Sequence, residues 1–377
     1  MLIDKIETLG DYKIRFTLKQ PFAPFLAYIA SPWVAIVAKE NAESGDIAKH
    51  PIGTGPFMFK KWAAGSSIEL VKNPNYFKKG RPFLDGIKIN MILEDSPWLA
   101  GLRSKKLDLT YHLEGAFLRN LKRIKRLKTE KWPALGYTGM LFNNTQPPFD
   151  NPKVRLAISY AIDRQDVIDS GMLGAGTVTS PLPEALGHGV PVDKLTGYKH
   201  NYEKAKQLLK EAGYPNGLKM RLLTANDIGF YMTISQVIQS QLKNAGIEVE
   251  IIGKEWGAFL GTLVQAEGYD AFMLDFGPMA LDPDVYVYRL WNSKGFWNIG
   301  KFADAEVDKL MEQGRVVSDP AERKKIYARL SKRMADIGAA VWLFRSDLTW
   351  IKHSWVKSKG DYFHAMGGKF ENIWLDR

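Results

Sequence analysis

One strand–helix–strand unit in the middle of the chain constrains the fold more than any other segment. A strand pattern at 218–224 leads into a helical pattern at 231–244, and a second strand pattern follows at 247–252 after Gly246, which ends the helix. Because the links are short, we expect the two strands to lie parallel in one sheet, joined by a right-handed crossover. A helix at 256–266 and a strand at 269–275 extend this sheet, so the middle of the chain is predicted to be an α/β domain.

The flanking segments divide the chain into two lobes. The first third reads as sheet with turns, and a boundary is expected near Gly136, before a strand at 137–143. Helical patterns follow, the last of them with Asp319 as N-cap and Pro320 at the first helical position; they lie at 152–168, 202–212, 304–317 and 320–337. The last forty residues return to strand patterns. The predicted division is 1–135 for the remainder of lobe one, 136–345 for lobe two, and 346–377 for a C-terminal return to lobe one.

The composition suits a chain with a large core that needs no covalent staples. Of its 377 residues, 45% are hydrophobic and 12% aromatic, and there is no cysteine, which excludes disulfides and thiolate catalysis. No run approaches the roughly 18 apolar residues of a membrane span. The charged start of the sequence lacks the apolar stretch of a signal peptide, so no signal peptide is expected in the chain as given.

A net charge of +11 raises the question of a nucleic-acid partner. The densest basic run lies at 119–131, where Leu118, Leu121, Ile124 and Leu127 recur at helical spacing. Charges opposite an apolar stripe are typical of a solvated helix face, so we predict such a helix and no nucleic-acid partner.

Sequence signatures of catalysis are missing. The six histidines include no pair at metal-ligand spacing, and neither a Gly-x-Ser-x-Gly motif nor a phosphate-binding loop occurs. Asp275, Asp282 and Asp284 resemble the paired acids of a glycosidase, but Asp282-Pro283-Asp284 reads better as a turn beyond a parallel strand. We therefore predict no enzyme, no catalytic residue, no metal and no cofactor, with a secreted hydrolase using Asp275 and Asp282 as the alternative.

Five ordered motifs carry a resemblance to a known family. They are 51–57 (PIGTGPF) with 73–77 (NPNYF), 142–144 (FNN), 149–155 (FDNPKVR), 205–217 with its AGYP step, and Tyr269-Asp270 before Asp282-Pro283-Asp284. In this order they resemble the family 5 solute-binding proteins, the peptide-, nickel- and oligosaccharide-binding receptors of ABC importers. The resemblance implies an α/β, two-lobed periplasmic-binding-protein-like fold of the class with an extra subdomain. Measured against that family, the N-terminal part of lobe one is expected to be absent.

The resemblance also implies a function and its partners. The protein is expected to capture a peptide, an oligosaccharide or an opine-like solute between two hinged lobes and to deliver it to an ABC permease. Its expected location is periplasmic or extracytoplasmic, and its expected state is a monomer.

The implied ligand contacts lie on lobe two, mostly beyond the strand at 269–275. They are Trp256, Phe276, Gly277, Met279, Asp282, Trp291, Asn292 and Trp297. Peptide-binding members resemble one another in an Asp that pairs with the ligand's α-amino group, and Met279 occupies that position here. Because a buried ammonium needs a carboxylate, a free-amino peptide is the less favourable ligand unless Asp275 or Asp282 substitutes.

Overall fold

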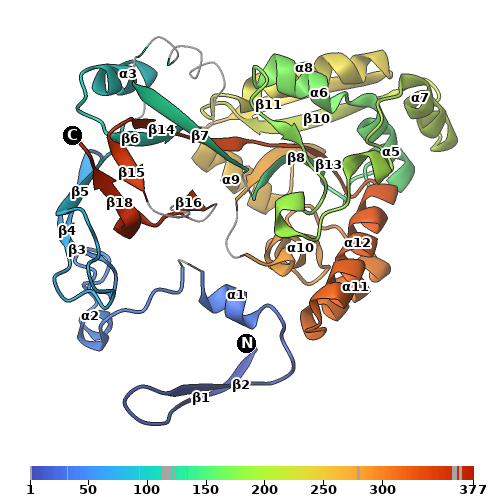
Figure 1. Ribbon diagram of the computed structural model, residues 1–377. Coiled ribbons are helices and arrows are strands. Elements are labelled where there is room, and N and C mark those ends of the chain that lie inside the picture. Colours follow the sequence, from blue (N-terminus) through green and yellow to red (C-terminus); the bar gives the residue numbers. More distant parts are fainter. Residues whose placement is uncertain are drawn as a thin grey trace. The chain divides into compact units, whose positions relative to one another are not determined.

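The computed structural model describes most of the chain: residues 2–31, 33–92, 94–112, 121, 124, 126–133, 135–277, 281–358, 363–364 and 367–377. The chain forms two compact units, each assembled from separate stretches of sequence (Figure 1). Unit 1 comprises Met1–Ala30 and Ala134–Ser346, and unit 2 comprises Ser31–Pro133 and Asp347–Arg377.

Unit 1 carries the α/β domain. Its strands are β1 (Ile3–Thr8), β2 (Ile14–Leu18), β8 (Tyr137–Phe142), β9 (Thr177–Val178), β10 (Leu218–Ala225), β11 (Ile247–Lys254), β12 (Ala271–Phe276) and β13 (Ala340–Arg345). Its α-helices are α1 (Phe25–Ile29), α5 (Pro152–Ala161), α6 (Arg164–Asp166), α7 (Tyr202–Glu211), α8 (Tyr231–Asn244), α9 (Trp256–Gln265), α10 (Pro283–Trp291), α11 (Ala305–Val316) and α12 (Pro320–Asp336).

Six strands of unit 1 form one mixed sheet in the order β11-β10-β12-β8-β13-β9. Strands β10, β11 and β12 are parallel, as the strand–helix–strand pattern predicts, and β8 is antiparallel to β12 and β13. From β10 the chain crosses to β11 on one side, and from β11 it returns past β10 to β12. Two right-handed crossovers in opposite directions place their helices on opposite faces. Figure 1 shows α8 and α9 on opposite sides of the sheet.

Aspartates cap the starts of α11 and α12, and the sequence analysis predicted the cap at Asp319. The Asp319 carboxylate accepts from the N–H of Glu322 at 2.8 Å ahead of α12, and Asp304 accepts from Val307 at 3.0 Å ahead of α11. The expected long helix after Asn151 is shorter than predicted. Its α-helical part ends at Ala161, because the chain turns extended at Ile162 and Asp163 caps α6; a π-helical turn at Val167–Gly171 follows.

The segment 1–30 belongs to unit 1, whereas the sequence analysis grouped it with lobe one. Two hydrogen bonds hold it there. The N–H of Ala23 donates to the carbonyl oxygen of Arg315 at 2.7 Å, and the Tyr28 hydroxyl donates to Asp284 at 2.8 Å.

Unit 2 consists of small antiparallel sheets. Its elements are α2 (Lys39–Glu43), β3 (Phe57–Ala63), β4 (Ser67–Lys72), β5 (Gly86–Asn90), α3 (Asp95–Arg103), β6 (Leu109–His112), β7 (Leu127–Pro133), β14 (Asp347–His353), β15 (Val356–Ser358), β16 (Phe363–His364), β17 (Gly367–Gly368) and β18 (Ile373–Leu375). The sheets are β3-β4-β5, β6-β14-β7, β15-β18 and β16-β17. The chain after Ser346 therefore joins this unit through β14, and Leu102 and Ile351 lie fully buried in one of its cores.

The basic run at 119–131 is not one helix. Residues 113–120, 122, 123 and 125 lie outside the described part of the chain, but Leu127–Pro133 is strand β7. It pairs with β14 along its whole length, from Leu127 opposite His353 to Pro133 opposite Asp347. The ladder with β14, which is distant in sequence, overrides the helical spacing of the leucines.

Candidate functional site

The sheet of unit 1 has a topological switch point between β10 and β12. These neighbouring strands are parallel. After β10 the chain continues into α8, and after β12 it continues into α10. Figure 1 shows α8 and α10 on opposite sides of the sheet. Open α/β sheets bind ligands at such a point, outside the carboxyl ends of the strands. The carboxyl end of β12 consists of Asp275 and Phe276, and Gly277 follows.

Asp275 is the exposed residue of an otherwise buried strand. Its Oδ1 accepts a hydrogen bond from the Thr138 hydroxyl at 3.1 Å, and Thr138 lies directly opposite it on β8. Dense packing around this position raises the pKa of Asp275 to about 6, against hydrogen bonds from Thr138 and the Phe276 N–H that lower it. Because the side chain stays open to solvent, water reduces this desolvation, and the carboxyl group is ionised at pH 7.

The backbone after β12 lies unusually close to the start of β8. A Cβ added at Gly136 would lie 2.2 Å from the carbonyl oxygen of Phe276, so only glycine fits there. A Cβ at Gly277, in contrast, would meet nothing within 4 Å. The absence of a side chain at Gly136 therefore lets the Phe276 backbone approach the start of β8, whereas a small side chain at Gly277 would have room.

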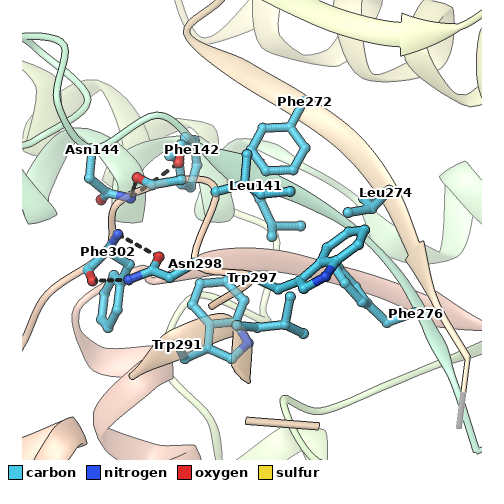
Figure 2. A pocket seen from close by; sticks show the side chains of 13 residues that line it. Leu141, Phe142, Asn144, Phe272, Leu274, Phe276, Trp291, Trp297, Asn298 and Phe302 are labelled. Carbon is cyan, nitrogen blue, oxygen red and sulfur yellow. Dashed lines mark hydrogen bonds between the residues drawn. The ribbon is translucent and has the colours of Figure 1, made fainter. Parts of the chain in front are cut away.

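An aromatic pocket lies on the Phe276 side of β12 (Figure 2). Its lining comes from β8, β12, α10 and the loop after α10: Leu141, Phe142, Asn144, Phe272, Leu274, Phe276, Leu290, Trp291, Trp297, Asn298, Ile299, Gly300 and Phe302. The cavity has a volume of about 10 Å³, which is roughly the room that one water molecule needs. In this arrangement the pocket is therefore closely packed, and a solute can meet it only at its open side.

The two tryptophans of this pocket differ in exposure. Trp291 is 2% exposed; it packs edge-on against Phe302, and its Nε1 donates to the Tyr137 hydroxyl at 3.4 Å. Burial raises the pKa of Tyr137 to about 12, so that hydroxyl stays neutral. Trp297 is 40% exposed, and Figure 2 shows its ring beside Leu274 and Phe276. Trp297 is thus the lining tryptophan that a solute can reach.

Two predicted contacts have their polar groups bound inside the protein. The Asp282 carboxylate caps α10 by accepting from the N–H of Asp284, and it accepts two hydrogen bonds from Arg323, each 2.9 Å long. Asn292 is 2% exposed; its Oδ1 accepts from the N–H of Lys294, and its carbonyl oxygen accepts from Asn298. Both residues therefore have structural roles in this arrangement.

Trp256 lies at the same edge of the sheet, at the start of α9. Its ring stacks on that of Phe259 with the centroids 5.3 Å apart, and its backbone N–H donates to the Asp227 carboxylate at 3.1 Å. Met279 lies outside the described residues. Of the predicted contacts, Phe276, Trp291 and Trp297 line the aromatic pocket together, whereas Trp256 follows the carboxyl end of β11 and Gly277 follows that of β12.

The sequence analysis missed Gly136 and Thr138. Both lie at the start of β8, and their positions opposite β12 depend on an antiparallel register that no local pattern specifies. A single glycine directly before an apolar strand was the sequence feature that could have indicated a close backbone contact at Gly136.

Within the described ranges, no three His, Cys, Asp or Glu side chains are grouped so that they could hold a metal ion. In the same ranges, no helix has both the length and the apolar character that crossing a bilayer requires.

Comparison with known families gives one match that covers most of the chain. Residues 1–298 match the family described as bacterial extracellular solute-binding proteins, family 5 Middle. Among curated proteins, glutathione-binding protein GsiB of Pectobacterium atrosepticum is 27% identical over 374 residues, which cover 96% of this chain and 71% of that protein. Heme-binding protein A of Haemophilus influenzae is 29% identical over 347 residues, which cover 86% of this chain and 61% of that protein.

A solved structure shares the fold. The ABC transporter-associated periplasmic binding protein DppA from Helicobacter pylori, in complex with peptide STSA, aligns with 100% of this chain and 75% of its own. The TM-score is 0.85 and the sequence identity is 28%. The chain therefore has the α/β fold of a periplasmic binding protein, and it spans 61% to 71% of the length of the two curated relatives.

Proposed function

Because this chain belongs to the bacterial extracellular solute-binding proteins of family 5, we propose that it is the solute-binding component of an ABC importer. In this role the protein acts as a monomer outside the cytoplasm, in the periplasm or its equivalent. It captures a small solute there and delivers the solute to a membrane permease. The family match over residues 1–298 carries this proposal. The open edge of the unit 1 sheet, with Trp297 and Phe276 beside it, supports it as a place for the solute.

The proposed solute is a peptide, an oligosaccharide or an opine-like compound. Two of the three relatives described above carry glutathione or peptide STSA in their names, which favours the peptide class, whereas the third is named for heme. Aromatic rings at the sheet edge suit both sugars and apolar side chains. The proposed contacts are Trp256, Phe276, Gly277 and Trp297, with Met279 as a further candidate.

We expect solute binding to change the arrangement of the two units. The chain passes between them after Ala30, after Pro133 and after Ser346. Several strand connections of this kind act as a hinge, and a solute that binds one arrangement better shifts the population toward it. Small-angle scattering with and without solute measures this shift.

The hydrolase alternative lacks support at Asp282. Both of its oxygens accept hydrogen bonds from Arg323, and its side chain is 8% exposed. A general acid or base must exchange a proton with the substrate, which this ion pair opposes. We therefore expect the bound solute to be recovered chemically intact.

Native mass spectrometry and calorimetry test the proposal. The protein is titrated with dipeptides, disaccharides and opine-like sugar conjugates, and the solute is analysed by chromatography after incubation. We expect saturable one-to-one binding and unchanged solute. Absence of binding to every class, or turnover of any of them, contradicts the proposed function.

A further inference from the structure

The positive charge of the chain is concentrated in unit 2. Counted over the sequence, unit 2 has 24 Lys and Arg against 14 Asp and Glu, a net charge of +10, whereas unit 1 has 28 against 27, a net charge of +1. The aromatic pocket is lined by residues of unit 1 alone, so the excess charge lies outside it. A large excess of one sign on one unit attracts an anionic partner to that unit.

Many cations of unit 2 are exposed and lack an acidic partner, because its acids are already engaged. Glu69 lies 3.6 Å from the ammonium groups of both Lys60 and Lys88, and Glu371 lies 2.7 Å from that of Lys78. In the part of unit 2 that the structure describes, no ion pair joins an acid to the following exposed cations: Lys72, Lys79, Lys106, Arg126, Lys128 and Lys131.

The loop between β4 and β5 places two exposed aromatic rings beside positive charges. Phe77 is 73% exposed and Phe83 is 41% exposed. The Lys78 ammonium lies 5.8 Å from the centre of the Phe77 ring, and the Arg81 guanidinium lies 3.7 Å from that of Phe83. The loop therefore presents apolar rings and cations together at one surface.

This loop is held by the turn η4 (Phe370–Asn372). The Tyr76 hydroxyl donates to the Glu371 carboxylate, and Nε of Arg81 donates to Oδ1 of Asn372 at 3.1 Å. Glu371 is 9% exposed, so the side chains that it binds cover its charge. Because the loop is already fixed, little conformational entropy is lost when its exposed rings bind a partner.

We infer that unit 2 binds the surface of a bilayer that contains anionic phospholipids. The main contact is a loop patch made of Phe77, Lys78, Lys79, Arg81, Phe83 and the exposed Lys369, which precedes Glu371 by two residues. Each Lys or Arg close to an anionic leaflet raises the affinity about fivefold, and aromatic rings beside these cations suit the boundary between headgroups and acyl chains.

A bilayer fits this surface better than a protein or a nucleic acid does. The unpaired cations are spread over the end of β4, the loop patch, the segment after α3 and strand β7. Lipid headgroups can move to wherever such charges lie, whereas a folded partner needs them in a matching array. For an importer receptor, this contact raises the concentration of the protein beside the permease; that consequence, unlike the lipid binding itself, rests on the proposed function.

Co-sedimentation with vesicles tests the inference. One set of vesicles contains phosphatidylcholine with about 30% phosphatidylglycerol, and the other contains phosphatidylcholine alone. At about 50 mM salt we expect the anionic vesicles to bind the protein at least about tenfold more tightly, and at about 500 mM salt we expect this binding to weaken at least about tenfold through screening. Equal binding to both sets, or binding to neither, overturns the inference.

Two double variants with the same change in net charge locate the contact. Lys79→Gln with Lys369→Gln removes two charges from the loop patch and should weaken binding to anionic vesicles about 10- to 30-fold. Lys210→Gln with Lys243→Gln removes two exposed charges from α7 and α8 of unit 1 and should stay within about twofold of the wild type. Equal losses in the two proteins would contradict a contact through the loop patch.

Phe77→Ala tests the aromatic part of the contact. We expect binding to anionic vesicles to weaken about three- to tenfold while its salt dependence stays the same, because no charge is lost. Thermal unfolding of each variant confirms that it is folded. Unchanged binding in a folded Phe77→Ala protein would show that the ring does not enter the bilayer.

A single-stranded oligonucleotide serves as the competing polyanion. If it binds the wild type more tightly than the anionic vesicles do at the same salt concentration, the partner is a nucleic acid and the inference is overturned. None of these measurements contains a solute. Their failure therefore leaves the proposed function in place, and failure of the solute titrations leaves the lipid binding in place.

Discussion

Arg323 donates two parallel hydrogen bonds to Asp282, each 2.9 Å long, across the 41 residues that separate them in sequence. The pair ties the start of α10 to α12, and the Arg323 Nε–H donates to the carbonyl oxygen of Gly314 at the end of α11. Asp282 is therefore a packing element for three helices. Asp282 follows β12 in the sequence, but its carboxylate binds Arg323 on α12 and does not face the sheet edge.

Asp282→Asn should lower the free energy of unfolding by about 3 kcal/mol, because it leaves the Arg323 guanidinium buried without its counter-charge. Urea unfolding followed by tryptophan fluorescence measures the loss. The double variant Asp282→Asn with Arg323→Met should recover part of it, since no buried charge remains. A variant of full stability that loses a hydrolytic turnover would instead favour the enzyme alternative.

Asp284 should make stability depend on pH. Burial, outweighing the attraction of Arg315, raises the pKa of its carboxyl group to about 6 in the folded protein, against about 3.9 in an unfolded chain. The folded state therefore binds the proton more tightly, and this contribution is fully present below about pH 4 and lost as pH rises through about 6. The difference in unfolding free energy between wild type and Asp284→Asn should shift by about 2 kcal/mol between pH 7.5 and pH 4.

A control separates this titration from the hydrogen bond that Asp284 accepts. Tyr28→Phe removes the donor and should lower stability by about 1 kcal/mol while leaving the pH dependence in place. A wild type and an Asp284→Asn variant with parallel pH profiles would show that Asp284 does not titrate in this range.

Local patterns predicted the regular elements of unit 1 well. The parallel strands β10, β11 and β12 and the capped helices α11 and α12 follow from periodicity and from short-range hydrogen bonds, such as the one that the Glu322 N–H donates to Asp319. The helix expected at 119–131 was wrong from Leu127 onward, because β7 is held by β14, more than 200 residues later in the chain. Pairings between distant segments leave no local trace.

The candidate site was predictable only in part. The sequence predicted Phe276 and Gly277 at the end of a parallel strand, and in the structure Phe276 ends β12 and Gly277 follows it. It did not distinguish the exposed Asp275 from the buried Asp282, because that difference depends on Arg323, which lies on another helix. Nor did it distinguish Trp297 from Trp291, whose burial depends on Tyr137 and Phe302.

The close approach of Gly136 to Phe276 gives a matched pair of variants. Gly136→Ala places a methyl group 2.2 Å from a backbone oxygen that cannot rotate away, so we expect a loss of about 1–3 kcal/mol in unfolding free energy. Gly277→Ala introduces the same methyl group into open space and should stay within about 0.5 kcal/mol of the wild type. Equal effects of the two variants in urea unfolding would contradict the contact.

The two tryptophans of the pocket should separate stability from solute binding. Trp291→Ala removes a ring that is 2% exposed and packs against Phe302, so it should cost about 3–5 kcal/mol of unfolding free energy. Trp297→Ala removes a ring that is 40% exposed and should cost less than about 2 kcal/mol. If Trp297 contacts the solute as proposed, its loss weakens binding at least about tenfold in calorimetry, because the exposed aromatic ring that contacts the solute is removed. Unchanged affinity in a stable Trp297→Ala protein would remove this residue from the site and leave the pocket as internal packing.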